Sequence, residues 1–155
     1  MRKNLISFSL PLLLVAIDRI SKAWALIAIR QHPVEVIPGL LSFRYAENSG
    51  AAFGMLSGMR LLNGLLTLTL LIVLFAFICH HRKHAGMWYS GLTVIGGGIS
   101  HLYDRLLGKN IIDFIRLDFI DFPIFNFADI CICVGTVLLA LFYLKADSDS
   151  RREKA

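Results

Sequence analysis

The chain has 155 residues, of which 56% are hydrophobic and only 17% are Asp, Glu, Lys or Arg. Soluble domains carry about 25% charged residues, so the composition excludes a large soluble catalytic domain, and the scarcity of polar residues excludes a disordered chain. The length predicts one domain, and the apolar content is enough for roughly four helices that each cross a bilayer. We interpret the net charge of +5 as a signal for membrane orientation and not for nucleic-acid binding.

Four apolar segments are each long enough to cross a membrane. Within a single domain of residues 1–155, they cover residues 5–29, 61–78, 87–107 and 125–144, and two longer loops cover residues 30–60 and 108–123. The first segment follows Arg2 and Lys3, as in a signal peptide, but Asp18 and Arg19 interrupt it and no small-residue cleavage site follows. We therefore expect an uncleaved first span.

The basic residues are concentrated on one side of this arrangement. That side holds both ends of the chain and the connection between the second and third segments, with Arg2, Lys3, Arg82, Lys83, Lys145, Arg151, Arg152 and Lys154. The basic residues of the two longer loops are offset by acids in the same loops. The positive-inside rule then predicts that both termini are cytoplasmic and that the longer loops face outward.

The first longer loop has strand-like residues at Val34 to Ile37 and at Leu41 to Tyr45, separated by turn residues. This pattern predicts a small sheet at the outer surface. The second longer loop alternates large apolar residues with acids over residues 110–122. Its periodicity predicts either a strand or a short segment lying along the membrane interface.

Ionisable residues inside a membrane are costly and are candidates for function. Counted along their helices from the cytoplasmic side, Asp18 lies about 20 Å deep, and Asp104 and Asp129 each lie about 24 Å deep. Because the hydrocarbon layer is about 30 Å thick, these groups meet in its outer third, with Asp113 just beyond. They either form a polar site or, like Asp18 and Lys22 at i, i+4 spacing, pair only to hold the helices together.

Asp113 and Asp129 differ from the other charges because neither has an obvious basic partner nearby in the sequence. Two carboxyl groups held close together share one proton, so their pKa values separate. One group can then activate water while the protonated one polarises a carbonyl. The pair therefore indicates acid–base chemistry.

Five sequence blocks resemble, in order, those of the bacterial lipoprotein signal peptidase (signal peptidase II) family. Asp18–Lys22 resembles D-x-x-[TS]-K, Asn48–Gly54 resembles N-x-G-A-A-F-G, and Gly96–Arg105 resembles G-G-A-x-G-N-x-x-D-R. Ile111–Ile115 resembles V-V-D-F-I, and Phe122–Asp129 resembles F-P-x-F-N-x-A-D. The resemblance extends over nearly the whole chain.

The resemblance implies an α-helical integral membrane protein of the bacterial inner membrane, with its site near the outer leaflet. It implies an aspartic endopeptidase that removes the signal peptide of a diacylglyceryl-modified prolipoprotein by cutting before the lipidated cysteine. It implies no metal or cofactor. We expect a monomer surrounded by membrane lipid, since one chain supplies both carboxyl groups.

The resemblance also assigns roles to individual residues. Asp113 and Asp129 are expected to be the catalytic pair. Substrate binding is expected from Asn48, Arg105 and Asn126, and structural support of the site from Asp18, Lys22 and Asp104.

The third block departs from the family pattern. Gly98, Ser100 and His101 stand where the family usually has Ala, Gly and Asn. A neutral His offers one donor and one acceptor in a different geometry from an amide, so any substrate contact made through that Asn is not transferred to this chain. The simplest expectation is that His101 forms a hydrogen bond within the helix bundle.

Other chemically active residues favour structural interpretations. Cys79, Cys131 and Cys133 lie in apolar runs and are interpreted as small buried residues. His80, His81 and His84 flank Arg82 and Lys83 in a basic connection without a carboxylate, which does not favour a metal site. Residues 96–98, three glycines inside an apolar span, predict close helix packing, and Ser21 is adjacent to Lys22, so the two cannot pair across a helix as a protease dyad.

Two alternatives from other functional classes are open. A transporter or channel component would use the carboxylates as a relay, but no span carries a charge in its inner half. A catalytically impaired relative would bind acylated peptides without cutting them. The presence of both acids and their flanking motifs speaks against that alternative.

Overall fold

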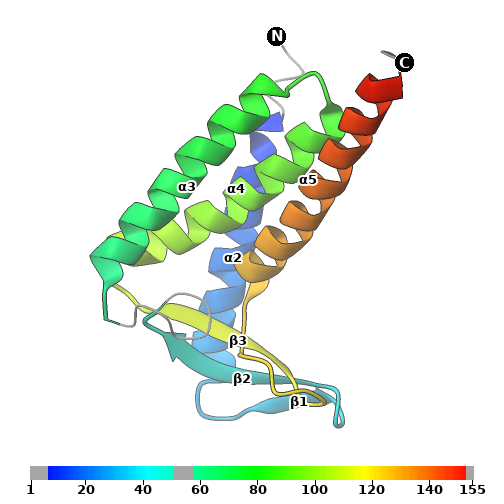
Figure 1. Ribbon diagram of the computed structural model, residues 1–155. Coiled ribbons are helices and arrows are strands. Elements are labelled where there is room, and N and C mark those ends of the chain that lie inside the picture. The colour runs from blue at the N-terminus through cyan, green and yellow to red at the C-terminus, as the bar shows by residue number, and fades with distance from the viewer. Residues whose placement is uncertain (1–6, 51–57, 153–155) are drawn as a thin grey trace.

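The computed structural model describes residues 7–50 and 58–152. Within them, helices α2 (Ser9–Ala28), α3 (Arg60–His80), α4 (Ala85–Leu106) and α5 (Phe127–Arg152) form a bundle. Strands β1 (Val34–Ile37), β2 (Leu41–Asn48) and β3 (Ile111–Leu117) form an antiparallel sheet in the order β1-β2-β3. The sheet lies at one end of the bundle, and α2 begins and α5 finishes at the other end (Figure 1).

The predicted mixture of long helices and a small sheet is confirmed, and the second longer loop contains a strand. By length and composition, two helices of the described residues are able to cross a membrane, Leu61–His80 and Phe127–Arg152. Helix α2 carries three charged residues near its middle, and α4 has two near its end. Four spans therefore remain a prediction.

Helix α5 continues beyond the apolar segment, which ends at Leu144, to Arg152. The added turns are polar, and Arg151 pairs with Asp147 at i, i+4 spacing with an N–O distance of 2.9 Å. Hydropathy alone does not predict this extension, because Ala, Lys and Arg favour helices whether or not they are apolar. Two parts of the predicted segments, residues 5–6 of the first span and residues 51–57 of the first loop, lie outside the described residues.

Helix α4 packs against the other three helices, and its three consecutive glycines explain how. A methyl group on Gly96 would meet Leu14 of α2, and one on Gly98 would meet Leu71 of α3. A methyl group on Gly97 would lie 2.5 Å from the carbonyl oxygen of Ala128 on α5. Each glycine therefore allows the close approach of a different neighbouring helix, which agrees with the packing role predicted for them.

Aromatic packing attaches the sheet to the end of α2. The ring of Trp24 contacts those of Phe43 on β2 and Phe114 on β3, with centroid distances of 5.3 and 6.1 Å. Ala25 of α2 and Ile29, the residue that follows the helix, are buried against Phe114. Because side chains alternate along a strand, Asp113 points away from this apolar contact. The packing of Phe114 thus fixes where Asp113 lies.

The segment before α5 is joined to β3. Phe125 forms an antiparallel bridge with Ile115, and its N–H donates to the Ile115 carbonyl at 3.0 Å. The carbonyl of Phe125 accepts from the N–H groups of Phe114 and Ile115. This bridge brings the start of α5 alongside the strand that carries Asp113.

Replacing Gly97 by Ala is expected to destabilise the bundle despite the higher helix propensity of alanine. The new methyl group meets a backbone carbonyl that cannot rotate away. The free energy of unfolding in detergent should fall by about 1–3 kcal/mol. Gly98→Ala is the matched control, since its methyl group meets the flexible end of Leu71. A Gly97→Ala protein at least as stable as Gly98→Ala would contradict this packing account.

Candidate active site

Four charged side chains from α2 and α4 form a cluster in which Asp18, Lys22 and Asp104 are buried and Arg19 is half-buried. Asp18 and Lys22 are 1% and 3% exposed. The Lys22 ammonium contacts Asp18 at 2.8 Å and Asp104 at 3.0 Å. Arg19 donates to both oxygens of Asp104, and to Asp18 at 2.9 Å. Buried charges are stable only when paired, and here each carboxylate has two basic partners.

Asp18, Lys22 and Asp104 were predicted to act together, and the structure brings them into contact. The sequence prediction did not include Arg19, which contacts both acids. Arg19 belongs to the same charged interruption of the first span. Two buried carboxylates need two basic partners, and Arg19 next to Asp18 in the sequence is the second one beside Lys22.

Asp18 also links the cluster to α5 and to a residue that departs from the family pattern. One carboxylate oxygen accepts the N–H of Ala128 at 3.0 Å, and the other accepts the hydroxyl of Ser100. Ala128 is in the first turn of α5, where N–H groups lack partners within the helix. Asp18 therefore fixes the start of the helix that carries Asp129.

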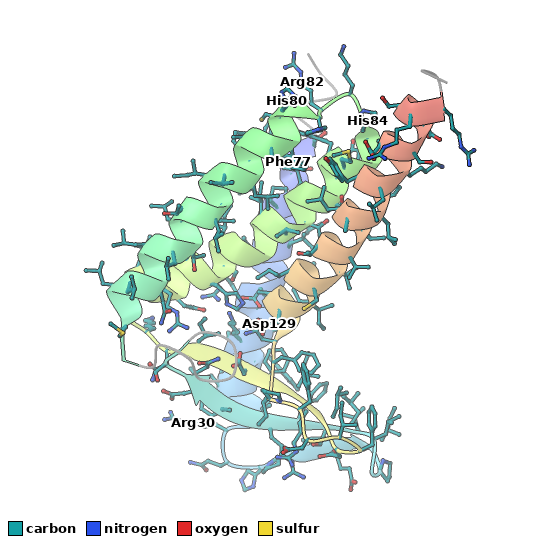
Figure 2. The ribbon with its side chains drawn as sticks, in the orientation of Figure 1. Arg30, Phe77, His80, Arg82, His84 and Asp129 are labelled. Atoms are coloured by element: carbon teal, nitrogen blue, oxygen red, sulfur yellow. The ribbon has the colours of Figure 1, made fainter. Side chains whose placement is uncertain are left out.

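Asn126 and Asp129 form a reciprocal cap at the start of α5. The side-chain oxygen of Asn126 accepts the N–H of Asp129 at 3.1 Å. In return, one oxygen of Asp129 accepts the N–H of Asn126 at 2.9 Å. This is the arrangement of a capping box, with Asn and Asp in the two positions. The cap holds the Asp129 carboxyl at the end of α5 nearest the sheet (Figure 2).

Asn126 also connects the two acids of the expected catalytic pair. It is fully buried, and its side-chain nitrogen donates to Asp113 at 2.5 Å and to the carbonyl of Ile112 at 3.3 Å. One side chain thus contacts Asp113 on β3 and Asp129 on α5. The two acids are 16 residues apart in the chain, from Asp113 to Asp129, and they line the same cleft.

The two acids have different surroundings. Asp113 is 3% exposed, whereas the Asp129 side chain is 37% exposed. Burial, and then the negative charge of Asp129, raise the pKa of Asp113 to about 6. The nearby amides of Asn126 and Asn48, and positive charge on His101, oppose this shift without cancelling it. The arrangement can therefore hold a protonated acid beside an ionised one, which acid–base catalysis requires.

His101 is a member of this site, and the expectation that it forms a hydrogen bond within the helix bundle is confirmed. Its Nε2 lies 3.0 Å from the second oxygen of Asp129. Asp129 has no Lys or Arg nearby in the sequence, and its partner is instead this histidine from another helix. A signal was present, because His101 and Arg105 are at i, i+4 spacing and share one face of α4.

Two cavities flank the acid pair, and both are lined by Asn48, Asp113 and Asp129. The first, of about 300 Å³, is the more polar of the two, because Asn63, Thr67, His101 and Arg105 line it beside Leu66, Leu70 and Ile111. The second, of about 490 Å³, is mainly apolar and is lined by Phe122, Pro123, Ile124, Phe125, Ile130, Cys133 and Val134. A third cavity, of about 550 Å³ between α2, α3 and α4, is lined by apolar residues and lies away from the acids.

Asn48, the last residue of β2, and Arg105 of α4 both contact the backbone that follows β2. The Asn48 side chain accepts the N–H of Gly50 at 2.9 Å. The Arg105 guanidinium donates to the carbonyls of Ser49, at 3.0 Å, and Gly50. Both therefore line the polar cavity and also order the adjoining backbone, while Ala51 to Gly54 of the same sequence block lie outside the described residues.

The cysteines differ from one another. Cys131 is buried, Cys79 is half-buried and Cys133 is exposed at the apolar cavity. The expectation that all three are buried is therefore wrong for Cys133, which lies on the outer side of α5. In the described residues, His, Cys, Asp and Glu form no group of three or more suited to a metal ion.

Comparisons with known proteins show which family and which solved structures the chain is similar to. The family model described as signal peptidase (SPase) II matches residues 10–145. The chain is 37% identical over 136 residues to a lipoprotein signal peptidase of Clostridium novyi, covering 84% of this chain and 92% of the relative. It is 37% identical over 150 residues to one of Streptococcus pyogenes serotype M5, covering 95% and 97%.

A solved structure described as a bacterial membrane enzyme superimposes with a TM-score of 0.85 at 29% identity, covering 93% of this chain and 90% of that one. A second structure with the same description has a TM-score of 0.81, also at 29% identity, with 90% and 93% covered. The chain therefore belongs to the signal peptidase II family of aspartic peptidases.

Proposed function

We propose that Asp113 and Asp129 are the catalytic pair with which this chain removes signal peptides from lipoprotein precursors. The observation that carries the proposal is the shared contact through Asn126, which holds a buried acid and a more exposed one at the same cleft. In this proposal the substrate carries a diacylglyceryl group, and the bond cut precedes the lipidated cysteine.

The surroundings of the two acids give each a role. Asp113, whose pKa is raised to about 6, holds the shared proton and donates it toward the carbonyl oxygen of the scissile bond. Asp129, which accepts N–H donors at a helix N-terminus, is the ionised base and takes a proton from the attacking water. Collapse of the tetrahedral intermediate returns the Asp129 proton to the leaving nitrogen and the carbonyl proton to Asp113.

The two cavities beside the acids support a substrate of mixed polarity. The apolar cavity suits acyl chains or the apolar end of a signal peptide, and the polar cavity suits the peptide backbone. Asn48 and Asn126 supply amide groups next to the acids. Arg105 supports binding by ordering the backbone at Ser49 and Gly50.

We further propose that the single domain crosses the bacterial inner membrane four times as a monomer. Large apolar side chains are exposed along the outward faces of α2, α3 and α5, as lipid contact requires. Arg82 lies at the end of the bundle away from the sheet, and Asp129 lies at the sheet end (Figure 2). The positive-inside rule then makes the Arg82 end cytoplasmic and puts the acids near the outer leaflet.

Asp113→Asn and Asp129→Asn should each abolish cleavage of a diacylglyceryl-modified prolipopeptide. Each amide keeps one of the two oxygen acceptors but cannot exchange a proton as a carboxyl does. The rate constant kcat should fall by about 10²–10⁴-fold. Purified protein in detergent, with product followed by mass spectrometry, provides the measurement.

The matched control is Asp147→Asn, because Asp147 is an exposed acid of α5 that pairs with Arg151 at the far end of the helix. It should cleave at the wild-type rate. Near-normal activity in either Asp113→Asn or Asp129→Asn would overturn the assignment of the pair.

The pH dependence of kcat/KM should report the proton on Asp113, since this parameter reflects the free enzyme. Because its pKa is raised from 3.8 to about 6, Asp113 stays protonated up to about pH 6. Above about pH 6, kcat/KM should fall about tenfold per pH unit. The matching limb in kcat should lie at higher pH, because bound substrate adds to the burial of Asp113.

Initial rates at low substrate concentration, measured across this pH range in one detergent, test the prediction. A decline that is complete near the ordinary pKa of 3.8 would show that Asp113 is not the acid.

A further inference from the structure

His101 is the one titratable side chain in the described polar cleft that the proposed mechanism does not use. It comes from α4, its side chain is 13% exposed, and Nε2 lies 3.0 Å from Oδ1 of Asp129. The other oxygen of Asp129 already accepts the N–H of Asn126. His101 is therefore the partner of the second carboxylate oxygen of Asp129.

The direction of the hydrogen bond between His101 and Asp129 follows from the second ring nitrogen. Nδ1 of His101 is buried and has no hydrogen-bond partner among the described residues. If Asp129 were the protonated acid, it would donate to a bare Nε2, and the proton of a neutral ring would then sit on Nδ1 as a buried donor without an acceptor. If Asp129 is ionised, it can only accept, so Nε2 carries a proton and donates it to Oδ1.

We propose that His101 is a positioning residue for Asp129: its imidazole donates Nε2–H to Oδ1 and holds that carboxylate aligned as the base. The assignment rests on the proposed function, and it makes the roles of the two acids unequal from geometry alone. With Nε2–H on one oxygen and the N–H of Asn126 on the other, the Asp129 carboxylate has a fixed orientation.

The other ionisable groups around Asp129 are few. Asp113 faces it from β3, and Arg105 lines the cleft from α4, one turn after His101. Asp18 of α2 contacts the neighbouring Ala128 and is paired with Lys22. Helix α3 contributes uncharged side chains to the described wall of the cleft, and α5 itself contributes Cys133 on the apolar side.

These neighbours give His101 a distinct effect on pH dependence. A hydrogen bond to a carboxylate favours the charged form, so Asp129 takes up a proton more readily when the donor is removed. The acid limb of the activity profile should then move to higher pH. A ring that served only to pack the bundle would change the amount of active protein and leave the position of that limb unchanged.

The test compares His101→Gln and His101→Leu with the wild type on a synthetic diacylglyceryl prolipopeptide. Gln carries an N–H donor at the same reach as Nε2, whereas Leu fills similar space without a donor. His101→Leu should lose about 10- to 100-fold in kcat with a KM within about threefold of wild type, and its acid limb should shift to higher pH. His101→Gln should keep the wild-type limb and most of kcat.

His80→Leu is the matched control, since His80 is exposed at the opposite end of the bundle from Asp129 (Figure 2). It should behave as wild type. An unshifted acid limb in His101→Leu, or equal losses in the Gln and Leu variants, would overturn the inference even with an active wild-type enzyme. Full activity in Asp129→Asn would instead overturn the proposed function, so the two failures are distinguishable.

Discussion

The buried carboxylate of Asp18 is the contact on which the site depends. It pairs with Lys22 on its own helix, accepts the hydroxyl of Ser100 on α4, and accepts the N–H of Ala128 on α5. A charge at 1% exposure is tolerated only with such partners. Because the same group holds α2, α4 and α5, the start of α5 has one position relative to the rest of the bundle.

The acid pair is built on that fixed helix start. The cap between Asn126 and Asp129 uses groups that a helix N-terminus leaves unpaired, so helix formation itself orients Asp129. Asn126 then reaches Asp113, whose strand is attached to α2 by the packing of Phe114. Two acids on separate elements therefore meet with different burial, and the difference in burial gives them different chemistry.

Much of this could be predicted from the sequence because it depends on local pattern. Hydropathy located the helices, alternation located the first two strands, and counting along the helices predicted that Asp18, Asp104 and Asp129 lie at one level of the bundle. Contacts that depend on how the helices are rotated against each other could not be predicted. The ring of His101 and the guanidinium of Arg19 find their partners only once the glycines at 96–98 have brought four helices together.

The central claim is that Asp113 and Asp129 share one proton, which resides on Asp113. Infrared difference spectroscopy tests it most directly, with the carboxyl stretch of Asp113 identified by its absence in Asp113→Asn. In the wild type the stretch should disappear with a midpoint near pH 6, and in Asp129→Asn the midpoint should lie lower, because the neighbouring negative charge is gone. An identical midpoint in both proteins, or a wild-type midpoint at the ordinary value of 3.8, would contradict the account.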